Sequence, residues 1–174
     1  MAEDLVSRAR AGDAGSRTRL ADRHYGAVHA LARKLLQDPE AARDVTQETF
    51  LRAFARMDQY SGERPFSSWL LKIATNLVRD LHRRKGRWET AEEDPADEEA
   101  ERPEAILQKG EEIGRVQAAL DALAPEVRAP LVLHLQEGMP VREIAWVLDL
   151  TENAVRMKIY RGLRKVRATL GGIS

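Results

Sequence analysis

Apolar side chains recur every three or four residues along most of this 174-residue chain, and this spacing restricts the chain to helices. The stripe is clear from Leu20 to Leu35 and again from Phe66 to Leu81. Alternation at period two, which a half-buried strand requires, does not occur in the sequence. Aromatic residues make up only 5% of the chain, which also favours helix over strand. We therefore predict an all-α protein.

The N-terminal half predicts a compact bundle of about four helices. One helix begins at Asp38-Pro39-Glu40, which supplies a capping side chain, a proline at the first helical position and an acid in the first turn. Residues 61–65, SGERP, predict a loop after this helix. The next helical stripe ends in the basic tract 83–87.

Charge divides the chain into segments, although its 28 basic and 28 acidic side chains cancel overall. Residues 51–87 carry nine basic and three acidic side chains, whereas residues 88–112 carry two basic and eleven acidic ones. The acidic segment has few apolar residues to bury, so it predicts a flexible linker. We predict two small helical domains, an N-terminal bundle at 1–87 and a C-terminal domain at 113–174, joined by this linker.

The C-terminal domain carries a helix-turn-helix pattern, because a helix at residues 141–148 and a second helix after it flank a three-residue turn. Ala145 is a small residue where the two helices cross. Asp149 tolerates the left-handed backbone that the turn needs, and Thr151 can cap the second helix. These residue types favour a helix-turn-helix over two unrelated helices.

The second of these helices is basic on its outer face, which fits the major groove of DNA. Arginine can make paired hydrogen bonds to guanine there, and lysine or asparagine can reach other base edges or phosphates. A basic amphipathic helix that only covers its neighbours has the same pattern, so this reading also stays open. The apolar stripe leaves on the outer face Glu152, Asn153, Arg156, Met157, Lys158 and Arg161.

Several classes of protein are excluded or disfavoured by composition. The chain has no cysteine, which excludes disulfides and thiolate metal sites. Its four histidines are scattered and no phosphate-binding loop is visible, so we expect no enzyme, no cofactor and no metal. No apolar run approaches the ~20 residues that cross a bilayer, and the start MAED is unlike a cationic signal peptide. We expect a cytoplasmic protein.

Three segments resemble motifs of the bacterial extracytoplasmic-function (ECF, group IV) sigma factors of the sigma-70 superfamily. Residues 44–50, DVTQETF, resemble the family's core-polymerase-binding helix, and residues 66–76, FSSWLLKIATN, resemble its promoter-melting segment. Residues 123–163 resemble its C-terminal helix-turn-helix domain. The resemblance implies an initiation factor that brings promoter specificity to core RNA polymerase. It also implies an anti-sigma factor as a partner.

The same resemblance implies three sets of site residues. Core RNA polymerase is expected to contact Asp44, Gln47, Glu48, Phe50 and Leu51. The minus-10 element, on the non-template strand, is expected to contact Trp69, Asn76, Arg79, Arg83, Arg84 and Lys85. Asn76 is expected in a loop that captures an unstacked base. The minus-35 element is expected to face Asn153, Arg156, Met157, Lys158 and Arg161.

Alternatives remain for single residues. Trp69 fits packing in the apolar stripe as well as base stacking. Asp44 and Glu48 share a helix face, and a divalent metal would need a third ligand that the spacing does not supply. Pro130 stands in a helical stretch, so that helix either starts late or bends. Pro140 stands where the family usually has a capping serine or threonine.

The C-terminal third alone also fits a second class, an autonomous helix-turn-helix regulator with an N-terminal sensing or dimerisation bundle. The segment 66–87 is both basic and aromatic, and a ligand-sensing bundle has no reason to be positive there. The segment 66–87 therefore favours a sigma factor over an autonomous regulator.

Overall fold

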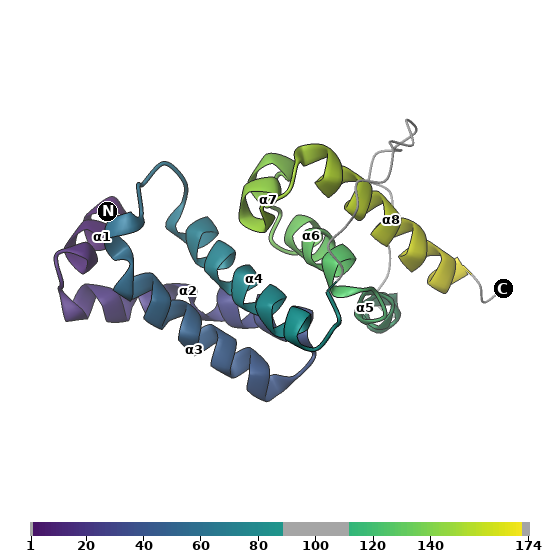
Figure 1. Cartoon of the computed structure of the whole chain (residues 1–174), viewed down its shortest axis with the longest axis horizontal. Coiled ribbons are helices and arrows are strands. Elements are labelled where there is room, and N and C mark those ends of the chain that lie inside the picture. The colour runs from purple at the N-terminus through teal and green to yellow at the C-terminus, as the bar shows by residue number, and fades with distance from the viewer. Residues whose placement is uncertain (1, 89–111, 172–174) are drawn as a thin grey trace. The chain divides into compact units, whose positions relative to one another are not determined.

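The computed structural model describes residues 2–88 and 112–171 (Figure 1). Every element in these residues is a helix, which confirms the predicted fold class. The chain forms two compact units, Met1–Asp80 and Leu81–Ser174, and each is described by itself. The predicted acidic linker lies almost entirely outside the described residues, and the domain limits 1–87, 88–112 and 113–174 stay predictions.

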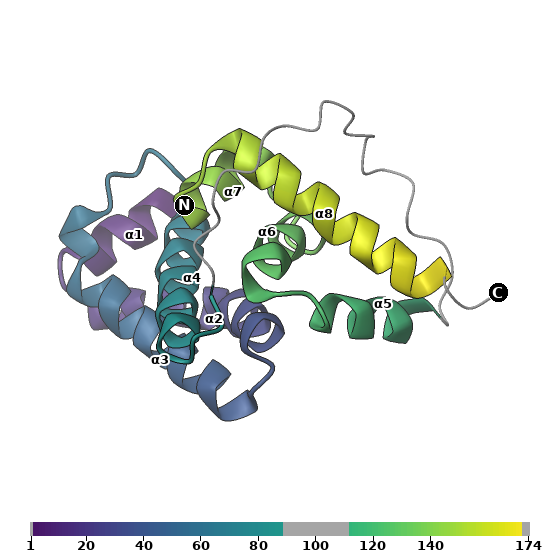
Figure 2. The ribbon, with the colours of Figure 1, turned by 45° about the vertical axis from the view of Figure 1, so that its right-hand side comes forward.

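The first unit is a helical bundle, and the two apolar stripes predicted at 20–35 and 66–81 contribute to its core. It contains α1 (Ala2–Arg10), α2 (Ala14–Leu36), α3 (Pro39–Ala55), the short 3-10 helix η1 (Met57–Gln59) and most of α4 (Phe66–Arg84). Helix α4 runs beside α2 and α3 in both Figure 1 and Figure 2. The bundle buries Leu31 on α2, Val45 on α3 and Leu70 on α4, so every long helix contributes to the core.

Helix starts in this unit follow from side-chain caps. The Asp38 carboxylate accepts hydrogen bonds from the Glu40 and Ala41 amides at 3.0 and 3.2 Å, which confirms the predicted start of α3. Helix α2 begins earlier than the apolar stripe indicates, because the Asp13 carboxylate accepts from the Ser16 amide at 2.7 Å. Hydrogen bonding to Ser16, first with its side chain and second with its backbone amide, lowers the pKa of Asp13.

The second unit contains the predicted helix-turn-helix. Helices α5 (Glu112–Asp121), α6 (Pro125–Leu135) and α7 (Val141–Leu148) each pack against α8 (Glu152–Gly171). Asp149 ends α7 in the left-handed conformation with φ of 55°. The Thr151 hydroxyl accepts from the Ala154 amide at 3.1 Å and caps α8, and Ala145 is buried. The predicted roles of Asp149 and Thr151 in the turn are therefore confirmed.

Two prolines mark the other helices of this unit. Helix α6 starts at Pro125 and runs through Pro130, so it does not start late. Pro140 precedes α7 and supplies no side-chain cap; its carbonyl accepts from the Glu143 and Ile144 amides at 2.9 and 3.0 Å. Backbone hydrogen bonds thus begin α7 without the usual hydroxyl.

Helices α6 and α8 are in close contact at Gly162. A Cβ at this position would lie 2.9 Å from Leu131 Cδ2 and 3.3 Å from Val127 Cγ1, and Leu131 is fully buried. We expect Gly162→Ala to lower the free energy of unfolding by about 1 kcal/mol, because overpacking outweighs the higher helix propensity of alanine.

Gly114→Ala is the matched control, since a Cβ added to this exposed helical glycine would have no atom within 4 Å of it. It should stabilise the chain by about 0.5–1 kcal/mol. Urea unfolding of both variants measures the two effects. Stabilisation by Gly162→Ala equal to that of Gly114→Ala would show that α6 and α8 are not in close contact there.

Candidate functional site

The outer face of α8 presents the residues that the sequence predicts for DNA contact. Asn153 and Arg156 are exposed, and the Arg156 guanidinium donates to the Glu152 carboxylate at 2.9 Å. Met157 and Arg161 are half-buried beside them. Beyond this cluster, α8 carries the exposed side chains of Arg164, Lys165 and Arg167. A row of cations on one helix of this kind suits the phosphates and base edges of a DNA groove.

Lys158 does not belong to this outer face, so that part of the expectation is wrong. Its exposed fraction is 7%, because it lies three residues after Val155 and four before Gly162, on the buried side of the helix. Burial lowers the pKa of Lys158, and the nearby Glu126 carboxylate opposes this shift. Lys158 therefore faces the interior of the second unit.

Asn76 is also placed differently from the expectation. It lies in the middle of α4, which is continuous from Phe66 to Arg84, and not in a loop. Its Oδ1 accepts from Arg79 Nη2 at 2.7 Å, one helical turn further on. Apolar residues continue on both sides of Asn76, so no signal in the sequence breaks the helix there. The predicted base-capturing loop is not at this position.

The end of α4 is a cationic surface. Arg83, Arg84 and Lys85 are exposed, and Arg79 is half-buried one turn earlier. Trp69, at the other end of α4, is half-buried and packs against Tyr60 and Phe66 at ring-centroid distances of 5.3 and 5.7 Å. Trp69 thus takes part in an aromatic cluster, as the packing alternative predicts.

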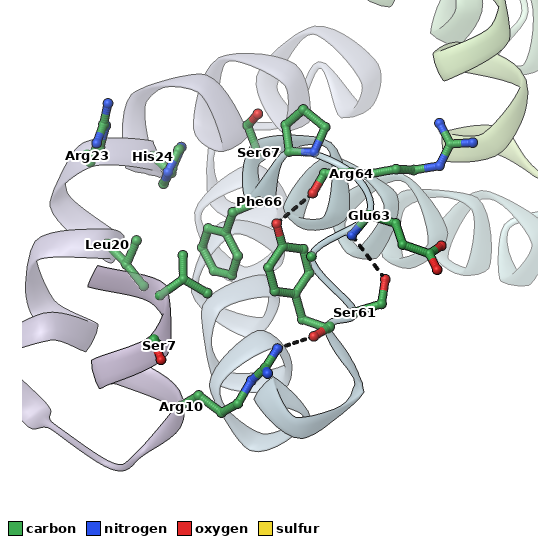
Figure 3. A pocket seen from close by; sticks show the side chains of 14 residues that line it. Ser7, Arg10, Leu20, Arg23, His24, Ser61, Glu63, Arg64, Phe66 and Ser67 are labelled. Atoms are coloured by element: carbon green, nitrogen blue, oxygen red, sulfur yellow. Dashed lines mark hydrogen bonds between the residues drawn. The ribbon is translucent and has the colours of Figure 1, made fainter. Parts of the chain in front are cut away.

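A cavity of about 610 Å³ lies beside this aromatic cluster, and no motif in the sequence predicts it (Figure 3). Its walls come from α1, α2, the loop at 60–65 and the start of α4. Cationic and aromatic side chains share the lining, which includes Arg10, Arg23, His24, Tyr60, Arg64 and Phe66. A volume of this order lies within the range of small-molecule sites. The sequence predicts only a loop at this place, from Ser61 and Gly62 between Tyr60 and Phe66, and not a cavity.

The cavity loop is fixed by hydrogen bonds within itself. The Tyr60 hydroxyl donates to the Arg64 carbonyl at 2.6 Å, and the Ser61 hydroxyl accepts from the Glu63 amide at 3.3 Å. The Tyr60 ring meets the Phe66 ring edge to face at 5.4 Å. These contacts contribute to the shape of this cavity wall.

His24 on the cavity wall makes the stability of the fold depend on pH. Burial first, and the Arg23 charge second, lower the pKa of His24 from its ordinary 6.5. Between the two pKa values, His24 therefore binds a proton in the unfolded chain and stays neutral in the folded chain. Well above pH 6.5, His24 is neutral in both states and costs no stability. As the pH drops through 6.5 towards the lower pKa of the folded state, the free energy of unfolding falls.

We expect urea unfolding at about pH 7.5 and about pH 5 to show a loss of stability at the lower pH. His24→Gln should remove part of that loss, because glutamine does not titrate. Parallel pH profiles for the parent and His24→Gln would contradict the assignment to His24.

The surface of α3 carries the residues expected to contact polymerase. Asp44 and Gln47 are exposed, and Leu51 is 59% exposed, which is high for a large apolar side chain. These three residues share one helix face because they are spaced by three, four and seven positions. Glu48 ion-pairs with Arg52 at 2.6 Å. The face thus combines acidic, amide and apolar groups.

Phe50 lies beneath this surface. It is buried, and its ring stacks on Tyr25 and packs against Phe54 at centroid distances of 6.4 and 6.1 Å. Phe50 therefore supports the α3 face from below.

Two further observations concern metal binding and membrane spans in the described residues. Among the described residues, no group of three or more His, Asp or Glu side chains is arranged to hold a metal ion. Within the same part of the chain, none of the helices combines the length and apolar character needed to span a bilayer.

Comparisons with known proteins match both helical parts of the chain to one family. Residues 20–88 match the Sigma-70 region 2 family, and residues 113–166 match the Sigma-70 region 4 family. The chain is 38% identical to the ECF RNA polymerase sigma factor SigE of Mycolicibacterium smegmatis, over 85% of this chain and 59% of SigE. It is 32% identical to the RNA polymerase sigma factor CnrH of Cupriavidus metallidurans, over 95% of this chain and 92% of CnrH.

The structure of CnrH in complex with the cytosolic domain of CnrY is similar to this chain, with a TM-score of 0.71. That comparison has 30% sequence identity and covers 98% of this chain and 97% of CnrH. The chain therefore belongs to the sigma-70 family, within its extracytoplasmic-function group. The match of residues 20–88 to region 2 disfavours a sensing or dimerisation bundle there.

The chain spans only part of some relatives, namely 59% of SigE and 65% of BldN of Streptomyces coelicolor, to which it is 31% identical over 96% of its own length.

Proposed function

We propose that this chain is an alternative sigma factor that binds core RNA polymerase, recognises the minus-35 and minus-10 promoter elements and promotes melting of the promoter. One observation carries the proposal: regions 2 and 4 of the sigma-70 family occur in this order on one chain. The factor has no chemistry of its own and needs no cofactor, because binding energy alone opens the DNA. It works in the cytoplasm, where the polymerase and the chromosome lie.

Core polymerase binds the first domain, residues 1–87, through the α3 face. Leu51 supplies an exposed apolar anchor, and Asp44, Gln47 and Glu48 surround it with polar groups. An apolar centre with a polar rim is typical of protein interfaces. Phe50 holds this face in place from below.

The minus-35 element binds the second domain, residues 113–174, through α8. Arg156 and Asn153 face the bases, with Met157 and Arg161 at the edge of the contact. Exposed arginine at this place supports direct readout of guanine, and the thioether of Met157 suits a thymine methyl group. Buried Lys158 acts on the orientation of α8, and not on the bases.

The minus-10 element binds the first domain through α4 and the cavity. Arg79, Arg83, Arg84 and Lys85 hold the phosphates of the non-template single strand, and Asn76 and Trp69 lie on the same helix. We place the captured base in the cavity of Figure 3, because a flipped base requires a shaped pocket with aromatic walls. Tyr60 and Phe66 supply these walls.

An anti-sigma factor is the further partner that the family membership supports, since the related CnrH has been solved with the cytosolic domain of CnrY. The acidic segment 88–112 joins the two DNA-binding domains and keeps them on one molecule. Binding of this chain to core polymerase, to DNA or to an anti-sigma factor requires no insertion into a membrane.

In vitro transcription from genomic fragments tests the proposed function. Core RNA polymerase with the purified chain should yield RNA from defined start sites that share two upstream elements, and core polymerase alone should not. Absence of positioned transcripts from every fragment would refute the proposal.

A further inference from the structure

Arg10, the last residue of α1, makes one long-range hydrogen bond to η1 and one to the cavity loop. Its Nε donates to the Met57 carbonyl at 3.2 Å, and its Nη2 donates to the Tyr60 carbonyl. Hydrogen bonds from a charged donor are stronger than those between neutral groups. Arg10 therefore ties the first residue of η1 and the first residue of the loop to the N-terminal helix.

Tyr60 is the residue through which this tie can shape the cavity. Its hydroxyl closes the loop onto Arg64, and its ring contacts Phe66 and Trp69 at 5.4 and 5.3 Å. A shift of the Tyr60 backbone would move an aromatic wall of the cavity and the loop that follows. Arg10 also lines the cavity, with its side chain directed towards this loop (Figure 3).

Helix α1 gives Arg10 a firm base. The Arg17 side chain of α2 donates from Nε to the Ala9 carbonyl at 3.0 Å, and Ala9 is fully buried. The last turn of α1 is thus fastened to α2 by packing and by a hydrogen bond. All of α1 lies before residue 20, where the match to region 2 begins.

We propose that Arg10 is a positioning residue that holds the 60–65 loop in the shape that selects the base captured in the cavity. Helix α1 is then part of the promoter-reading device and more than an N-terminal cover. The inference rests on the proposed function, because it assigns a residue that controls base choice at the minus-10 element. Arg10 acts through Tyr60 and need not touch the base itself.

Arg10→Met tests this role, and Arg8→Met is the matched control because Arg8 is exposed on the same helix and loses the same charge. Open-complex formation is measured with core polymerase on four promoters that differ in the captured base. We expect Arg10→Met to reduce the preference for the best base roughly 10-fold, with core-polymerase affinity changed less than about twofold. Arg8→Met should keep the preference of the parent.

Two further measurements separate this role from a general loss of structure. Hydrogen exchange of the Glu63 amide in the isolated protein should accelerate in Arg10→Met and not in Arg8→Met. Arg10→Lys, which keeps the charge but loses the two-pronged geometry, should show an intermediate preference.

A parent protein that initiates with a clear base preference, retained by both Arg10→Met and Arg10→Lys, would overturn the inference and leave the proposed function standing. A parent that fails to initiate at all would overturn the proposed function itself. Unchanged exchange of the Glu63 amide in Arg10→Met would also count against the inference, whatever the transcription assay shows.

Discussion

Leu51→Glu is expected to weaken binding to core RNA polymerase by roughly 30-fold or more, which corresponds to about 2 kcal/mol. Leu51 is 59% exposed on α3, so its replacement leaves the core of the bundle intact. At an interface, however, the new carboxylate would lose its hydration without a partner placed to neutralise it. The loss of apolar contact adds to this cost.

Ala14→Glu is the matched control for Leu51→Glu. Ala14 is exposed at the first position of α2, where an acidic side chain suits the helix dipole. Affinity for core polymerase, measured by titration with a labelled chain, should be close to that of the parent. Equal affinity for Leu51→Glu and Ala14→Glu would show that the α3 face does not meet the polymerase.

Arg156→Ala is expected to reduce discrimination between a matched and a mismatched minus-35 element by about 10- to 100-fold, or about 1–3 kcal/mol. The Arg156 side chain is exposed and is held only by a surface ion pair with Glu152 at 2.9 Å. Such pairs contribute little to stability, so Arg156 can leave Glu152 for a base edge at small cost. Its loss should relax sequence preference without unfolding α8.

Arg164→Ala separates base reading from phosphate binding. Arg164 lies two turns further along α8, where its guanidinium stands 5.8 Å from the centre of the Tyr160 ring. Arg164→Ala should weaken initiation by a similar factor on matched and mismatched promoters. It should also lower the salt dependence of promoter binding. If Arg156→Ala also weakened both promoters by the same factor, Arg156 would be a phosphate contact and not a base reader.

The elements that the sequence predicts well are those with a local cause. The start of α3 depends on Asp38 and its near neighbours, and the turn before α8 depends on Asp149 and Thr151. Each of these signals acts over a few residues, so it can be read from the chain directly. The helical class, the turn and the outer position of Arg156 are therefore predictable.

The parts that escape prediction depend on contacts between distant residues. Arg10 and Tyr60 are 50 residues apart, and no local pattern indicates that they meet. Lys158 is buried because α6 covers that side of α8, whereas its charge suggests exposure. The loop expected at Asn76 rests on resemblance alone, whereas the apolar stripe around it favours the continuous helix that the structure contains.

Footprinting of one promoter with and without core polymerase tests most directly whether the chain is a sigma factor. The chain alone should leave the duplex unprotected, and the chain with core polymerase should protect both upstream elements and make the minus-10 strand reactive to single-strand probes. Strong, sequence-specific protection by the chain alone, unchanged when core polymerase is added, would identify an autonomous regulator and contradict this account.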